Sequence, residues 1–237
     1  MTTEKETAAA GCKTQCSSAG RSEAVHEAAL AAADFAAMVF LAPEMPELEA
    51  RAGSIVPHLK EVLASDIDMR EGALFQRLLA SEAAGGFAGL GTSALDVRRE
   101  HAKLFLGVGE ETIPLSISVW TSEKGLLRQD AAETCSKLYA QAGVALDESA
   151  PYDPDHIGTA FAFLSLLELR AGAAREAAAK GDTIDTAETF EPEKFFGAVI
   201  APAFSRILKR ISARKDAPFY AAVGTLFTIL SEEGLFG

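Results

Sequence analysis

Two adjacent polar residues, Asp155 and His156, are the strongest candidates for chemistry in this sequence, because they stand at the head of an apolar segment. Ile157, Phe161 and Leu164 fall on one helical face of that segment, and other apolar residues fill a second face. A helix that is apolar most of the way round lies inside a bundle. Its polar head is therefore expected where a buried element reaches the surface.

The head of this helix has two interpretations. Asp153 is predicted to cap the helix, with Pro154 at its first position, because carboxylates accept early backbone N–H groups and proline suits that position. Asp155 in the first turn gains about 0.3–1 kcal/mol from the positive helix end. Asp155 and His156 are then either an ordinary helix cap or a polar contact point at the mouth of a groove.

The other residues that support catalysis or metal binding are scattered. His26, His58 and His101 fall on different predicted helices. Cys12 and Cys16 are four residues apart and could share a metal on a helix, but no histidine or second cysteine pair lies near them.

Motifs with a known mechanism are missing from the sequence. It contains no Gly-x-Ser-x-Gly elbow, His-Glu-x-x-His pair, phosphate-binding loop or Cys-x-x-Cys pair. The glycine-rich stretch 85–91 lacks the dinucleotide fingerprint and is predicted to be a flexible turn, and Cys135 is interpreted as small core filler. We therefore expect no catalytic residue, no metal and no cofactor.

Composition and charge restrict the possible partners. The 237 residues include 22 basic and 34 acidic side chains, so the net charge is −12. Nucleic acid and anionic membranes require a clustered positive surface, so neither is expected as a partner. Residues 1–20 have no apolar core and are predicted to be a disordered tail rather than a secretory signal. No uninterrupted apolar run approaches the ~20 residues that span a membrane, which favours a cytoplasmic protein without stable membrane insertion.

Helical periodicity dominates the rest of the chain and predicts an all-α fold of about seven to nine helices, with one domain over residues 21–237. Pro202 is expected to bend the helix that contains it. The longer predicted helices are Ser22–Leu41, Asp96–Leu106, Glu123–Ala142, Pro154–Lys180, Glu193–Ser212 and Ala217–Glu233.

Two segments are predicted to be non-helical. Leu115, Ile117 and Val119 alternate with polar residues or Trp120, which predicts an extended connector anchored by that tryptophan. Residues 143–153 are the best candidate for a hinge between two lobes. A hinge of this length is compatible with a monomer or with a dimer that exchanges lobes.

The run P-D-H-I-x-x-x-F-x-F-L-x-x-L at Pro154–Leu167 resembles the signature helix of the TorD/DmsD/NarJ group of cytoplasmic chaperones for molybdenum-containing oxidoreductases. Residues 99–107 look like the E-Y-x-x-L-F-x-G segment of that family, and residues 118–120 look like its S-V-Y/W piece. Residues 123–129 resemble its E-G-L-L helix start, and residues 217–220 resemble the start of its last helix.

Some positions depart from the family pattern. His101 stands where the family usually has tyrosine, and Ala162 stands where a glutamate often precedes the second phenylalanine. Residues 196–202 lack the histidine and tryptophan of the corresponding family segment. These differences indicate a divergent branch with its own client.

The resemblance implies a chaperone that binds the twin-arginine leader of an apo catalytic subunit and delays export until the molybdenum cofactor is inserted. Such a leader has two arginines followed by an apolar segment, so its binder needs an apolar groove with an acidic end. Candidates for the apolar wall are Trp120, Phe105, Leu126, Tyr152 and Phe219. Candidates for the acidic end are Asp153, Asp155 and Glu123, with His156 orienting Asp155 or binding a peptide carbonyl.

Two other functions remain open at this point. One is a helical assembly factor of a reductase complex that reads no leader. The other is a nucleotide-dependent helical switch, which a strongly acidic chain without a phosphate-binding loop supports poorly.

Overall fold

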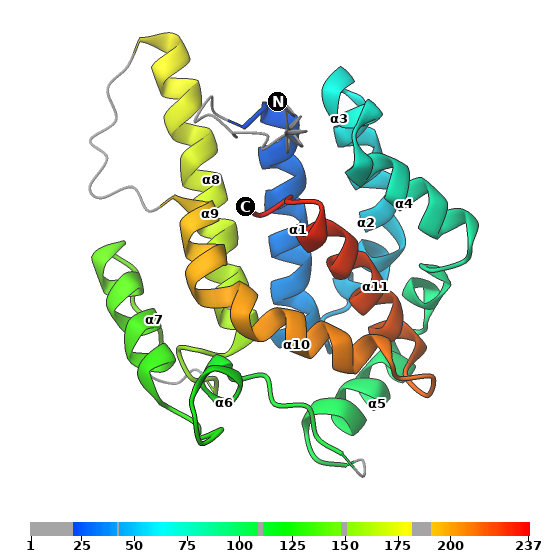
Figure 1. The fold of residues 1–237 in the computed structure, drawn as a ribbon, viewed down its shortest axis with the longest axis vertical. Coiled ribbons are helices and arrows are strands. Elements are labelled where there is room, and N and C mark those ends of the chain that lie inside the picture. Colours follow the sequence, from blue (N-terminus) through cyan, green and yellow to red (C-terminus); the bar gives the residue numbers. More distant parts are fainter. Residues whose placement is uncertain (1–20, 42, 109–110, 148–150, 182–190) are drawn as a thin grey trace, which may run out of the picture.

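The computed structural model describes residues 21–41, 43–108, 111–147, 151–181 and 191–237 of the chain, and these residues form helices joined by turns (Figure 1). None of them belongs to a named β-strand, so the predicted all-α fold is confirmed. The tail predicted for residues 1–20 and the cysteines Cys12 and Cys16 lie outside the described residues.

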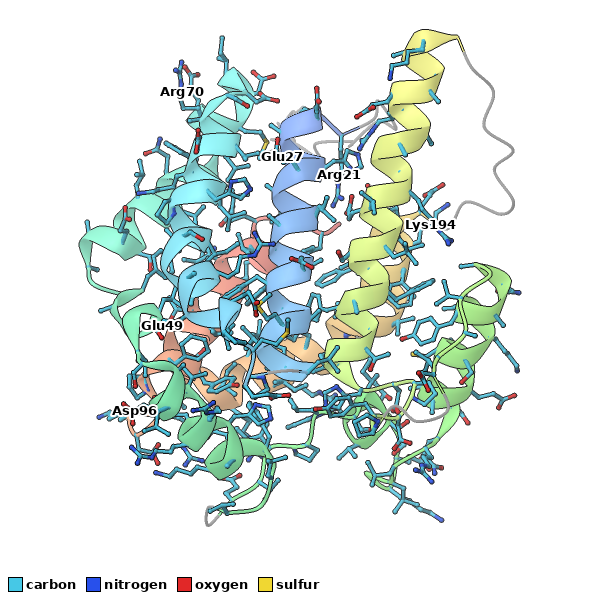
Figure 2. All side chains as sticks on the ribbon, turned by 180° about the vertical axis from the view of Figure 1, so that it is seen from behind. Arg21, Glu27, Glu49, Arg70, Asp96 and Lys194 are labelled. Atoms are coloured by element: carbon cyan, nitrogen blue, oxygen red, sulfur yellow. The ribbon has the colours of Figure 1, made fainter. Side chains whose placement is uncertain are left out.

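Helices α1 (Glu23–Leu41) and α8 (Ile157–Lys180) pack against each other at the centre of the bundle (Figure 2). The buried face of α1 is largely alanine, which lets the two backbones approach closely. Gly158 at the start of α8 has the same effect, because a Cβ atom there would lie 2.6 Å from Leu41 Cγ. Both helices are long and apolar enough to cross a membrane by length and composition alone, but half of each apolar window is buried inside the protein.

The remaining helices surround this pair (Figure 1). Those that follow α1 in the chain, up to residue 105, are α2 (Glu47–Ala64), α3 (Ile67–Glu71), α4 (Ala73–Ala83), the 3-10 turn η1 (Ala88–Gly91) and α5 (Ala94–Phe105). The others are α6 (Ile117–Thr121), α7 (Asp130–Gln141), α9 (Pro192–Phe195), the π-helical turn η2 (Phe196–Ile200), α10 (Ala201–Ser212) and α11 (Pro218–Glu232).

The segment from α9 to α10 changes direction where the sequence predicts a bend (Figure 1). Pro202 has no backbone N–H, and its ring crowds the carbonyl four residues earlier. The wider π-helical turn η2 immediately precedes this position. The expected bend is thereby confirmed, and it sends α10 across the bundle beneath α11.

Three predicted boundaries are wrong. Residues 117–121 form the short helix α6, and the extended backbone is confined to the residues before it, where Ser116 forms a single antiparallel bridge with His156. Helix α7 begins at Asp130 rather than Glu123. Helix α8 begins at Ile157 rather than Pro154. In each case contacts with distant residues determine the local backbone.

Buried apolar side chains from both sides of residues 143–153 belong to one cluster. Phe40 of α1 illustrates this, since its ring contacts Phe204 of α10 with 6.2 Å between centroids and also contacts Tyr220 of α11. The predicted division into two lobes joined by a hinge is not confirmed.

Candidate functional site

Asp155 is fully buried and holds α6 in place. Its Oδ2 accepts hydrogen bonds from Ser116 Oγ at 2.7 Å and from the Ser118 backbone N–H at 2.8 Å, while its carbonyl oxygen accepts one from Ile117 N–H. The carboxylate therefore caps the N-terminus of a helix that lies almost 40 residues earlier in the chain. The prediction that Asp155 contributes to an exposed acidic end is wrong, because its side chain is fully buried against the start of α6.

His156 caps α8 itself, with Nδ1 accepting a hydrogen bond from Gly158 N–H at 3.2 Å. This corrects the prediction that Asp153 is the cap. Burial lowers the pKa of His156 to about 4, so the imidazole is neutral at physiological pH and can accept that bond. The Tyr152 ring packs on the imidazole with 4.5 Å between centroids, and the Tyr152 hydroxyl donates to the Leu41 carbonyl at 2.6 Å.

Residues 122–129 form an ordered loop rather than the start of a helix. Its backbone is fixed by hydrogen bonds from Leu126 N–H to Ser122 Oγ and from Gln129 N–H to Ser118 Oγ. Arg128 adopts a left-handed conformation with φ = 54°, which is uncommon for a residue other than glycine. The result is a tip at which Leu126 and Leu127 are 50% and 57% exposed.

Asp153 is paired with Arg128 from this loop, with 2.8 Å between Oδ1 and Nε. The Arg128 side chain is 77% exposed and that of Asp153 is 28% exposed. An exposed pair of this kind contributes about 0–1 kcal/mol, so a competing guanidinium could replace Arg128 at small cost. Asp153 is thus a carboxylate at the surface that already binds an arginine.

Trp120 lies at the end of α6, next to the loop, and is partly buried. Its indole N–H donates to the Pro114 carbonyl at 2.9 Å, and its own carbonyl accepts a hydrogen bond from Arg206 of α10. The prediction that it anchors the connector is confirmed by the first of these bonds. Glu123 follows in the loop and is exposed.

Phe105 and Phe219 do not line a surface. Phe219 is fully buried and Phe105 is 9% exposed. Both belong to an aromatic core cluster around Tyr220, whose hydroxyl lies 2.8 Å from His101 Nδ1. The prediction that the two phenylalanines form part of a groove wall is wrong, because they fill the contact between α5 and α11.

Six predicted residues lie on two segments, 120–126 and 152–156, which the Arg128–Asp153 ion pair and the Ser116–His156 bridge bring side by side. We call this surface the loop face, and it consists of Trp120, Glu123, Leu126, Tyr152, Asp153 and His156. The sequence did not single out Leu127 and Arg128, although Leu127 follows Leu126 and Arg128 pairs with Asp153. Two consecutive leucines beside charged residues were an available signal of an exposed apolar tip.

The loop face offers the exposed Leu126, the aromatic rings of Trp120 and Tyr152, and the carboxylates of Glu123 and Asp153. These groups suit the binding of a polypeptide that carries apolar and basic side chains. Among the described residues, no group of three or more histidine, cysteine, aspartate or glutamate side chains could hold a metal ion.

The family model for the nitrate reductase delta subunit matches residues 69–194, which is more than half of the chain and contains the whole loop face. The chain belongs to this family. The family consists of maturation chaperones for redox enzymes and is related to TorD and DmsD, so the resemblance found in the sequence is confirmed. Its members bind a subunit of a molybdenum-containing enzyme and are in general not catalytic. A comparison with curated proteins found no match to this chain.

Proposed function

We propose that this chain is a cytoplasmic chaperone that binds the twin-arginine leader and the apo catalytic subunit of a molybdenum-containing oxidoreductase. In this role it assists cofactor insertion and proofreading before export. The observation that supports the proposal most is the family match, which spans the elements that build the loop face.

The chemistry of the loop face supports a leader as its ligand. The leader's apolar segment would pack on Leu126, Trp120 and Tyr152, two of which are at least one-third exposed. Its arginines would approach Asp153 and Glu123. His156 is neutral and holds Tyr152 in place rather than supplying charge.

Magnitudes indicate which part of the leader dominates the affinity. An exposed ion pair contributes about 0–1 kcal/mol, whereas burial of one leucine or phenylalanine side chain contributes roughly 1.5–3 kcal/mol. The apolar segment should therefore carry most of the affinity, and the arginines should mainly set the register of the bound peptide.

A peptide series tests this proposal. Binding of a synthetic twin-arginine leader is compared with that of one in which both arginines are glutamine and one in which the leucines are serine. Replacement of the leucines should weaken binding more. Trp120, the only tryptophan in the sequence, should report binding through a change in fluorescence. If no export leader binds at all, the leader-binding proposal is wrong.

The alternative is an assembly factor of a reductase complex that reads no leader. Affinity capture from the native cell with this chain as bait separates the two. An assembly factor would retain the molybdenum-enzyme subunit after its leader has been deleted, whereas a leader reader would lose most of it.

A further inference from the structure

Ser118 of α6 is fully buried, although its side chain is polar. Each of its three polar groups forms a hydrogen bond with a different residue outside α6. Its backbone N–H donates to Asp155 Oδ2 at 2.8 Å, its carbonyl accepts from the Ser122 N–H at 2.9 Å, and its Oγ accepts from the Gln129 N–H at 3.1 Å. One residue thus joins α6 to the head of α8 and to both ends of the loop 122–129.

The tip of this loop is held by hydrogen bonds rather than by burial. Leu126 and Leu127 are 50% and 57% exposed, so their side chains contribute little to fixing its conformation. Within the loop, the Leu126 N–H donates to Ser122 Oγ at 3.0 Å. The position of Leu126 therefore depends on how firmly the two ends of the loop are attached to α6.

The ion pair between Arg128 and Asp153 also connects the loop with the rest of the protein, but it is the weaker attachment. The Arg128 side chain is 77% exposed, and exposed ion pairs contribute little because water and salt screen them. The Ser118 hydroxyl lies inside the protein, where a hydrogen bond is stronger and a donor without a partner is costly. Loss of this hydroxyl should therefore release the end of the loop at Gln129.

We propose that Ser118 is a positioning residue for leader binding, because its hydroxyl holds the loop 122–129 in the conformation that presents Leu126 to the apolar segment of the leader. This inference rests on the proposed function, in which Leu126 packs against that segment. Ser118 is buried and does not touch the leader. It acts through the order of the loop, since a loop that is already ordered loses less conformational freedom when a ligand binds.

The variant Ser118→Ala tests this role in the full chain. It removes the hydroxyl but keeps the backbone N–H and carbonyl, so the hydrogen bonds to Asp155 and from Ser122 remain. We expect the affinity for a synthetic twin-arginine leader to fall at least fivefold, measured by the fluorescence of Trp120.

Hydrogen exchange measured by NMR without the leader follows the loop itself. In Ser118→Ala, the Leu126 amide should exchange at least tenfold faster, although its own acceptor on Ser122 is unchanged. The Tyr139 amide within α7 should exchange as in the unmodified protein. This pattern would show that the loop opens locally while the adjoining helix stays folded.

Two further variants separate the hydroxyl of Ser118 from general effects on α6. Thr121→Val removes a hydroxyl from the same helix that donates to the Ile117 carbonyl at 3.0 Å, within α6. It should change neither leader affinity nor Leu126 exchange. Ser118→Thr keeps a hydroxyl at residue 118 and should restore both towards the values of the unmodified protein.

Four results would overturn the inference. These are an unchanged leader affinity in Ser118→Ala, a loss of affinity without faster exchange of the Leu126 amide, an equal loss in Thr121→Val, and an equal loss in Ser118→Thr. If the unmodified protein binds no leader, the proposed function itself fails. The exchange measurements need no leader, so they still decide whether the Ser118 hydroxyl orders the loop.

Discussion

Two buried carboxylates in this protein, those of Asp155 and Glu100, cap helices that are remote in sequence. Asp155 accepts from the N-terminus of α6, and Glu100 of α5 accepts from the Phe219 and Tyr220 backbone N–H groups at the start of α11. Burial raises the pKa of Glu100, while the two backbone hydrogen bonds oppose that rise. Each carboxylate satisfies donors that a short or poorly capped helix would otherwise leave unpaired.

Replacement of Asp155 should therefore destabilise the protein. In Asp155→Ala, the Ser118 N–H and the Ser116 hydroxyl lose their acceptor, and each buried donor left unpaired costs about 1–3 kcal/mol. We expect the free energy of unfolding to fall by about 3 kcal/mol in urea denaturation. Asp155→Asn retains a carbonyl acceptor of the same shape and should lose less. An alanine variant as stable as the unmodified protein would show that α6 is held by other contacts.

Arg128 competes with any ligand arginine for Asp153, so its removal should improve leader binding. Arg128→Gln frees the Asp153 carboxylate and keeps a side chain of similar length. The lost pair is exposed and contributes about 0–1 kcal/mol, so the affinity for a twin-arginine leader should rise by up to about fivefold. Lys137→Gln is the matched control, because Lys137 is also a highly exposed partner in an ion pair on the adjoining helix α7. A weaker leader complex in Arg128→Gln would place Arg128 in the binding surface instead.

For single residues, the sequence predicted that Asp155 and His156 form a polar head on α8, but it did not predict which groups they bind. Asp155 and His156 are adjacent, yet one points into the protein toward α6 and the other caps α8. Their environments depend on Ser116 and Ser118, which no local pattern connects to residue 155. Phe105 and Phe219 could not be distinguished from surface aromatics for the same reason.

The close packing of helix α1 against helix α8 depends on Gly158. Gly158→Ala places a Cβ atom 2.6 Å from Leu41 Cγ and 3.2 Å from the Leu41 backbone nitrogen. Overpacking of this kind costs about 1–3 kcal/mol. We expect a lower melting temperature for Gly158→Ala and partial recovery in the double variant with Leu41→Ala.

Gly172 provides the control within the same helix. A Cβ atom at Gly172 would meet nothing closer than the end of the Arg175 side chain at 4.0 Å. Because alanine is favoured over glycine inside helices by about 0.5–1 kcal/mol, Gly172→Ala should raise the melting temperature slightly. If both substitutions had the same effect, close packing at residue 158 would not be the cause.

Element boundaries were predictable where they depend on local signals. Helix α1 ends just before Pro43 and the bend in the α9–α10 segment precedes Pro202, because proline acts on its own neighbours. The alternation at residues 115–119 predicted extended backbone, but Asp155 supplies a cap that makes residues 117–121 helical. Residues 122–129 have helix-forming composition but are held as a loop by Ser118 and Ser122.

At the scale of the whole molecule, a buried ionic cluster joins distant parts of the chain. Glu168 of α8 is 2% exposed and contacts Arg21 Nη1 at 3.0 Å and His26 Nδ1 at 2.7 Å. Arg21 also reaches Glu193 and the Leu235 carbonyl. Helix α8, the start of α9 and a residue near the C-terminus therefore meet at the Arg21 guanidinium.

Stability should depend on pH with two opposing contributions. Burial lowers the pKa of His101 and of His156 from 6.5 to about 4, so the unfolded chain binds more protons than the folded chain between these values. Their contribution is lost as the pH falls from 6.5 toward 4. Burial raises the pKa of Glu168 from 4.5 to about 7 despite the opposing charge of Arg21. Here the folded chain binds more protons, so this contribution is lost as the pH rises from 4.5 to 7.

The variant Glu168→Gln isolates the second contribution, because glutamine keeps the size and hydrogen-bonding capacity of the side chain but cannot titrate. Relative to this variant, the unmodified protein should lose on the order of 3 kcal/mol of its free energy of unfolding between pH 4.5 and pH 7, which is what a pKa increase of this size implies. Urea denaturation across that range measures the difference. A constant difference for Glu168→Gln would mean that Arg21 and His26 compensate fully for burial and that the carboxylate is ionised throughout.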